Sequence, residues 1–166
     1  YDDAGKRGHG AGIHGYLSHS VMKGNTISEN EILNSFDGSG AGIYFKLSLP
    51  TIEENSITWN HARYGSAIYC VFSIPLIVGN VIENNAMYDT YPLPLYLGSV
   101  EGAVTLDMGE DFLIEGNIIA RNTAAIGAGI NVKTNLTGRI QNNLIVNNTA
   151  YDPTAGGGMG GGIYCL

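Results

Sequence analysis

The chain has 166 residues and a mass of 17.6 kDa, the size of one domain with a core of its own. Its net charge of −7 argues against a nucleic-acid partner, and it has neither a basic amphipathic stretch for a membrane surface nor an apolar run that could span a bilayer. Glycine accounts for 24 residues while hydrophobic residues reach 44%, so the glycines belong to a packed structure rather than to a flexible linker.

In chain order, the first predicted element of each repeating unit is a short apolar strand after a glycine-rich entry. These strands are expected at residues 12–16, 42–46, 67–71, 103–107, 129–133 and 162–166. After a turn, a second short strand is expected around an apolar residue that precedes an Asn by three positions. The apolar residues at this position are Met22, Ile52, Ile77, Ile114 and Ile140.

A third short strand is expected inside the hexapeptide Asn-x-Ile-x-x-Asn, which recurs along the whole chain. Its copies begin at Asn25, Asn55, Asn80, Asn117 and Asn143. Self-similarity at this period is typical of a solenoid, and the gaps between strands are too short for a crossover helix. We therefore predict an all-β parallel β-helix of about five coils with three short strands per coil, forming a single domain over residues 1–166.

Equivalent residues of successive coils stack about 4.8 Å apart in a β-helix. The hexapeptide isoleucines Ile27, Ile57, Ile82, Ile119 and Ile145 are expected to fill one buried column. Each Asn is expected to turn the chain in the left-handed backbone conformation, with its amide paired to the Asn above and below.

Alternation along the first strand of each unit predicts which side chains face the core. Six branched residues are expected to point inward: Ile13, Ile43, Ile68, Val104, Ile130 and Ile163. Their neighbours are expected to point outward: His14, Tyr44, Tyr69, Thr105, Asn131 and Tyr164. Cys70 and Cys165 share an inward position three coils apart, roughly 14 Å, so we expect two buried cysteines and no disulfide between them.

These glycine-led segments and Asn hexapeptides resemble the right-handed parallel β-helix, or pectin-lyase-like, superfamily, in particular its surface-protein type with Asn-x-Ile-x-x-Asn repeats. The resemblance covers residues 8–166 and implies a right-handed solenoid. Members of the superfamily include polysaccharide lyases, glycosidases, phage tailspikes, adhesins and passive stalks, so the resemblance leaves catalytic and non-catalytic functions open.

Two groups of residues are candidates for catalysis. His9 lies in a Gly-His-Gly triplet similar to that of polygalacturonases, but the paired acidic segments of those enzymes are missing, and His9 matches Met159 in a sister segment. Asp107, Glu110 and Asp111 could hold Ca²⁺ in a pectate-lyase-like reaction, with Lys46, Lys133 or Arg121 as the base. The alternative for the second group is a Lys–Asp–Lys salt ladder on a solvated sheet.

Exposed aromatic residues are the candidates for carbohydrate binding. His14, Tyr44 and Tyr69 form an outward stripe on which a sugar could stack, although aromatic packing across strands explains the same pattern. Trp59 is expected to be exposed at a corner, as a ligand contact or as an isolated surface aromatic. The insertion at residues 86–102 is apolar for a loop and is expected to pack over the barrel or to meet a partner.

The function expected from these features is a non-catalytic structural or adhesive module, secreted or on the cell surface. Both ends of the sequence fall within the repeat and show no polar capping segment, so the expected partners are other copies or flanking solenoid coils. The alternative is a pectate-lyase-like or carbohydrate-binding domain for an acidic glycan, with Ca²⁺ needed only for lyase activity. Neither hypothesis involves nucleic acid or insertion into a membrane.

Overall fold

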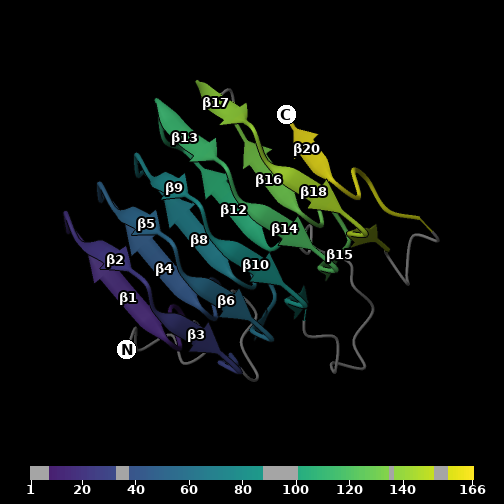
Figure 1. The fold of residues 1–166 in the computed structure, drawn as a ribbon, viewed down its shortest axis with the longest axis horizontal. Coiled ribbons are helices and arrows are strands. Elements are labelled where there is room, and N and C mark those ends of the chain that lie inside the picture. The colour runs from purple at the N-terminus through teal and green to yellow at the C-terminus, as the bar shows by residue number, and fades with distance from the viewer. Residues whose placement is uncertain (1–7, 33–37, 88–100, 135–136, 152–156) are drawn as a thin grey trace.

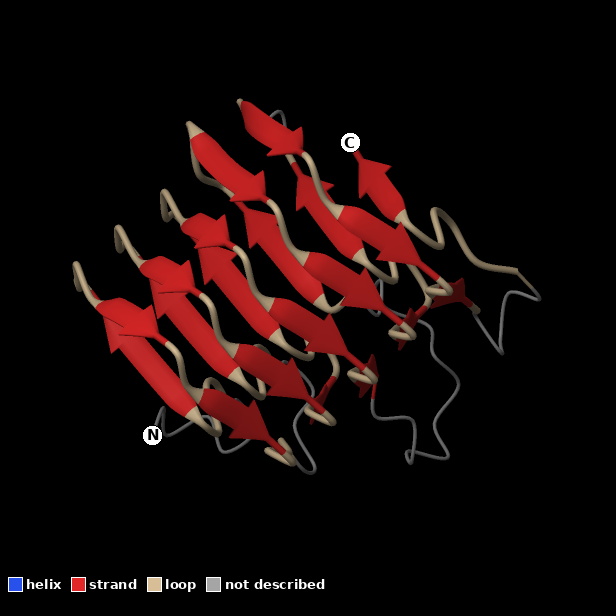
Figure 2. Ribbon diagram, in the orientation of Figure 1, coloured by secondary structure: helices blue, strands red, loops and turns tan. Residues whose placement is uncertain are grey.

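The computed structural model describes residues 8–32, 38–87, 101–134, 137–151 and 157–166. Within these ranges all the regular structure is β-strand, and the strands form coils stacked along one axis (Figures 1 and 2). The coils follow one another in chain order from one end of the stack to the other (Figure 1). No helix in the described part of the chain is long and apolar enough to cross a membrane.

Equivalent strands of successive coils form four parallel sheets. The first sheet contains β1 (Ile13–Tyr16), β4 (Ile43–Lys46), β8 (Ile68–Val71), β12 (Val104–Asp107), β16 (Ile130–Lys133) and β20 (Ile163–Cys165). The second contains β2 (Val21–Lys23), β5 (Thr51–Glu53), β9 (Leu76–Val78), β13 (Phe112–Glu115) and β17 (Gly138–Gln141). The third contains β3 (Thr26–Ser28), β6 (Ser56–Thr58), β10 (Val81–Glu83), β14 (Ile118–Ala120) and β18 (Leu144–Val146). The fourth contains β7 (His61–Ala62), β11 (Ala86–Met87), β15 (Thr123–Ala124) and β19 (Thr149–Ala150).

The parallel solenoid is therefore confirmed, with two differences from the prediction. A fourth strand of two residues follows the second Asn of the hexapeptide, where we expected only a loop. The described coils make about four turns rather than about five. The fourth strand is too short to leave a hydrophobic pattern in the sequence, since two residues cannot show an alternation.

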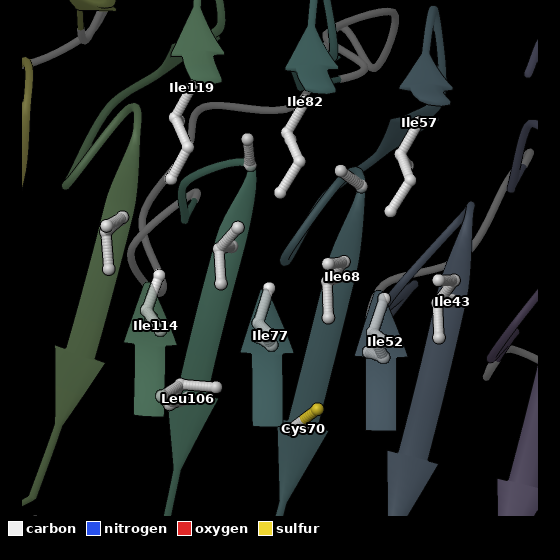
Figure 3. Packing of buried hydrophobic residues seen from close by; sticks show 14 of the residues in the cluster. Ile43, Ile52, Ile57, Ile68, Cys70, Ile77, Ile82, Leu106, Ile114 and Ile119 are labelled. Atoms are coloured by element: carbon white, nitrogen blue, oxygen red, sulfur yellow. The ribbon is translucent and has the colours of Figure 1, made fainter. Parts of the chain in front are cut away.

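Isoleucines stack in columns through the core, as expected. Ile27, Ile57, Ile82, Ile119 and Ile145 occupy the same register position in the third sheet. The first four are buried, and Ile145 packs against the core from the last coil. Figure 3 shows Ile57, Ile82 and Ile119 pointing toward isoleucines of the first and second sheets. The column on which the winding prediction depends is thus present.

Two ladders of Asn side chains hold the corners on either side of the third sheet. The Nδ2 atom of each Asn donates to the Oδ1 atom of the Asn one coil further on, over 2.9–3.1 Å. One ladder contains Asn25, Asn55, Asn80, Asn117 and Asn143, and the other contains Asn30, Asn60, Asn85, Asn122 and Asn148.

The left-handed backbone conformation lies one residue before the position we predicted for it. Residues with φ between 55° and 67° directly precede the ladder Asn, as Gly79 precedes Asn80 and Asn84 precedes Asn85. The ladder Asn therefore does not supply the unusual φ. Its side chain bridges coils, and the preceding residue makes the turn.

Cys70 and Cys165 occupy the same inward register position, as predicted, but only Cys70 is buried. Cys70, Leu106, Val132 and Cys165 follow one another across β8, β12, β16 and β20, and both cysteines are free. Cys70 is buried, and this burial raises the pKa of its thiol to about 12. Cys165 is exposed, because β20 has a neighbouring strand of the first sheet on one side only.

The outward side chains of the first sheet were expected to meet solvent, and several do not. Tyr44 is 5% exposed, Thr105 0% and Asn131 2%. Beside this face, single parallel β-bridges join His9 to Ser39 and Ser39 to Tyr64. A further bridge of this kind joins Glu101 to Ile126. The outer face of the first sheet is thus partly covered. Residues 88–100 of the predicted insertion lie outside the described residues.

Candidate functional site

A pocket of about 370 Å³ lies along the outer face of the first sheet. Its walls come from residues on or beside β1, β4, β8, β12 and β16, so it runs along the axis of the solenoid rather than along a strand. The lining residues are His9, Ser39, Tyr44, Lys46, Tyr64, Tyr69, Val71, Phe72, Glu101 and Lys133.

One end of the pocket contains a stack of aromatic rings. Tyr44 and Tyr69 pair in register on β4 and β8, and their rings are parallel within 3° with centroids 5.8 Å apart. The His9 ring lies against Tyr44 at 4.6 Å, and the His14 ring lies 5.0 Å from Tyr44 at a tilt. In-register stacking turns the faces of these rings toward one another, so a sugar ring would find no open face on Tyr44.

The other end of the pocket contains a network of charged and polar groups from three coils. Lys133 Nζ lies 2.7 Å from Glu101 Oε1 and 3.3 Å from Asp107 Oδ2, and the Tyr69 hydroxyl donates to Asp107 Oδ2 over 3.0 Å. Glu101 is only 1% exposed, and Asp107 is also buried. The lysine therefore holds two buried carboxylates together, and its charge offsets part of the cost of burying them.

The network changes the protonation of two of its members. Burial raises the pKa of Tyr69, and the negative charges of Glu101 and Asp107 raise it further. Burial by itself would lower the pKa of Lys133, but its hydrogen bonds to Glu101 and Asp107 and their charges outweigh that effect and raise it. At neutral pH the tyrosine is therefore a neutral hydroxyl and the lysine is an ammonium.

Several residues predicted for a site come together here. His9, Tyr44, Lys46, Tyr69 and Lys133 line the pocket. Asp107 contacts Tyr69 and Lys133, and His14 lies beside Tyr44. His9 is more than a spacer between glycines, since it lines the pocket and packs on Tyr44.

Other predicted residues lie elsewhere. Trp59 is exposed at the corner after β6, as expected, but it does not line the pocket. Asp107 is buried whereas Glu110 and Asp111 are exposed, and no three His, Cys, Asp or Glu side chains in the described ranges gather closely enough to hold a metal ion. The acidic run is therefore not a preformed cation site among these residues.

The predicted Lys–Asp–Lys ladder is only half present. Lys133 reaches Asp107 in the adjacent coil, whereas Val71 separates Lys46 from Asp107 in the register of the first sheet. Two coils correspond to about 10 Å. Lys46 accordingly makes no ion pair among the described residues.

Sequence reasoning missed four lining residues: Ser39, Tyr64, Phe72 and Glu101. For three of them, the sequence contains a shared repeat position that predicts their location. Ser39, Tyr64 and Glu101 each precede a glycine of the strand entry by one residue, in the position that also contains His9 and Met159. Comparison of that position in every coil, rather than in two, would have placed Glu101 beside the first sheet.

The fold and the pocket together define a parallel β-solenoid with a polar, aromatic-walled groove on its first sheet. No family model, curated protein or solved structure matches the chain.

Proposed function

We propose that this chain is a rigid, non-catalytic structural or adhesive module of a secreted or cell-surface protein. The observation that carries the proposal is the continuity of the two Asn ladders and of the isoleucine columns through all five hexapeptides. A solenoid whose every coil is tied to the next by side-chain amides and stacked aliphatic groups resists bending. Such a body is suited to holding loops and outer faces at fixed distances.

The charged network supports a non-catalytic function over a lyase. A lyase base must be a neutral amine when it takes the proton from its substrate. Lys133 has a raised pKa and is held between two carboxylates, so it remains charged and occupied. Lys46 makes no ion pair among the residues that the structure describes, but it lies two coils from Asp107.

We propose further that the chain belongs to the right-handed, pectin-lyase-like β-helices with Asn-x-Ile-x-x-Asn repeats. Its partners along the axis would be other copies or flanking solenoid coils. The register supports this, since β20 continues the pattern of β16 and each further coil can add by the same pairing.

An activity assay tests the proposal directly. The protein is incubated with a panel of uronate polymers, with and without Ca²⁺, and unsaturated products are followed by near-ultraviolet absorbance and new reducing ends by a colour reaction. We expect neither signal to exceed that of the buffer. Turnover that disappears in Lys133→Met, with the variant still folded by circular dichroism, would overturn the non-catalytic proposal.

A second candidate function, the binding of carbohydrate without cleavage, is favoured by the pocket. Tyr64 and Phe72 lie on opposite sides of Tyr69 along one coil, while Lys46 supplies a cation for an acidic group and Ser39 a hydroxyl for a sugar hydroxyl. A groove along the axis suits a linear chain better than a compact ligand.

Binding to immobilised acidic and neutral polysaccharides tests this candidate. We expect Lys46→Ala to weaken retention of acidic polymers. Arg139→Ala is the matched control, because it removes an exposed cation from the second sheet, away from the pocket. Equal effects of the two variants would indicate general charge attraction and would contradict a site in the pocket.

A further inference from the structure

An exposed ridge of apolar side chains runs along the corner after the first sheet. In four successive coils this corner is occupied by a large apolar residue, and the four residues are Leu17, Leu47, Phe72 and Met108. Their exposed fractions are 63%, 43%, 49% and 46%. Hydrogen bonds from Leu17 N to Lys46 O, from Leu47 N to Val71 O and from Phe72 N to Asp107 O keep the corners stacked.

The ridge combines two unfavourable features. All four residues have φ between 50° and 53°, in the left-handed region where a side chain beyond glycine or asparagine is strained by roughly 1–2 kcal/mol. They also place apolar surface in water. Two further apolar residues, Leu49 and Ile74, are exposed next to it and widen the patch.

The other corners of the same molecule provide an internal comparison. Ten residues with positive φ directly precede the ladder Asn, and nine of them are glycine, polar or charged. They are Gly24, Glu54, Gly79, Gly116 and Asn142 before β3, β6, β10, β14 and β18, and Glu29, Trp59, Asn84, Arg121 and Asn147 after those strands. Geometry alone therefore does not require apolar corners, and the ridge needs another explanation, such as a surface that covers it.

We propose that the ridge is an interface between two copies of this chain, packed side by side in antiparallel orientation. Evenly spaced side chains along a straight axis match an identical row, so the two ridges can meet coil against coil. The pairing is lateral and does not involve the ends of the solenoid. It is therefore independent of the association along the axis proposed above.

The charges beside the ridge favour the antiparallel orientation. Lys46 is exposed in the second coil and Glu110 in the fourth, and neither makes an ion pair among the described residues. A two-fold axis at Phe72, in the third coil, brings the Lys46 coil of one copy opposite the Glu110 coil of the other. Parallel packing would place like charges against like charges.

The apolar patch is narrow, so the pair is expected to be weak. Sedimentation equilibrium from micromolar to low millimolar concentration should show a monomer–dimer equilibrium. In Phe72→Asn the dissociation constant should rise by about tenfold or more, since an interfacial aromatic is lost. Asn tolerates the left-handed conformation, so this variant should fold at least as stably as the parent and keep its circular dichroism spectrum.

Trp59→Asn is the matched control, because Trp59 is also an exposed aromatic at positive φ, on a different corner. It should leave the dissociation constant unchanged. Lys46→Glu should weaken the dimer, and Lys46→Glu combined with Glu110→Lys should restore it. A monomer at every concentration, equal loss in Trp59→Asn, or no restoration in the double variant would each overturn the proposal.

Discussion

At the scale of the residue, Asn80 explains why the hexapeptide contains asparagine at its ends. Its Nδ2 atom donates to Asn117 Oδ1, to Ile52 O and to Val78 O, while its Oδ1 atom accepts from the backbone and side-chain nitrogens of Asn55. Aspartate has the acceptor without the donor, and glutamine is one methylene too long for the same spacing. The residue is fully buried, so each partner lost leaves an unsatisfied polar group.

We predict that Asn80→Asp lowers the free energy of unfolding by about 3 kcal/mol or more, because a carboxylate would face the carbonyl groups that the amide now satisfies. Urea denaturation measures the loss. Asn25→Asp is the control, since Asn25 belongs to the same ladder but is exposed and donates to Asn55 Oδ1 at the first coil. Equal losses in the two variants would contradict the explanation from burial.

The two cysteines should differ in reactivity for the same reason of burial. Cys70 is enclosed and its pKa is raised to about 12, so almost no thiolate is present at neutral pH. Cys165 is exposed on β20. With a maleimide at pH 7 we expect rapid labelling of one thiol per chain, absence of that label in Cys165→Ser, and labelling of Cys70 only after unfolding.

At the scale of the element, paired strands match large and small residues across coils. Phe45 on β4 pairs with Gly15 on β1, and Phe112 on β13 pairs with Gly138 on β17. In each pair a Cβ atom added to the glycine would collide with the phenyl ring. The glycine leaves room for the phenylalanine of the adjacent coil, which keeps the cross-section of the solenoid constant.

We predict that Gly138→Ala destabilises the fold by about 1–3 kcal/mol through overpacking against Phe112. Adding Phe112→Leu should recover part of that loss by returning volume to the site. A double-mutant cycle from thermal or urea unfolding gives the coupling energy. Additive effects would mean that the two side chains do not share the space.

At the scale of the whole molecule, the network of Tyr69, Asp107, Lys133 and Glu101 joins three coils by charge as well as by backbone pairing. Both titrating groups, Tyr69 and Lys133, have pKa values raised above their ordinary ones. The folded state therefore binds their protons more tightly than the unfolded state. The stability that Tyr69 and Lys133 contribute to the fold is complete below their ordinary pKa values, and it is lost as the pH rises above them.

Stability should accordingly fall above about pH 10, where tyrosine and lysine begin to ionise in the unfolded chain. Tyr69→Phe should make that fall shallower, although the variant is less stable at neutral pH because Asp107 loses a donor. Urea midpoints measured from about pH 7 to pH 11 provide the comparison. An alkaline slope unchanged by the substitution would contradict the assignment of Tyr69.

The candidate site contains residues that strand alternation predicts and others that it does not. Tyr44, Tyr69, Lys46 and Lys133 were placed on one face by alternation, because that face depends only on local strand geometry. Glu101 was not placed, since it precedes the strand and approaches Lys133 only through the stacking of coils. Whether Tyr44 met solvent also depended on residues from other coils, and His9 and Tyr69 cover its ring.

The sequence by itself determined the winding of this protein: the period of the Asn hexapeptide and the alternation of apolar residues specify which side chains enter the core and which coils are neighbours. Only the tertiary structure decided the burial of the outer face, the closure of the ion network and the exposure of the apolar corners. The physical reason is that core positions repeat with a local period. Contacts on the outside depend instead on which side chains meet across neighbouring coils, and the residue types at those positions vary from coil to coil.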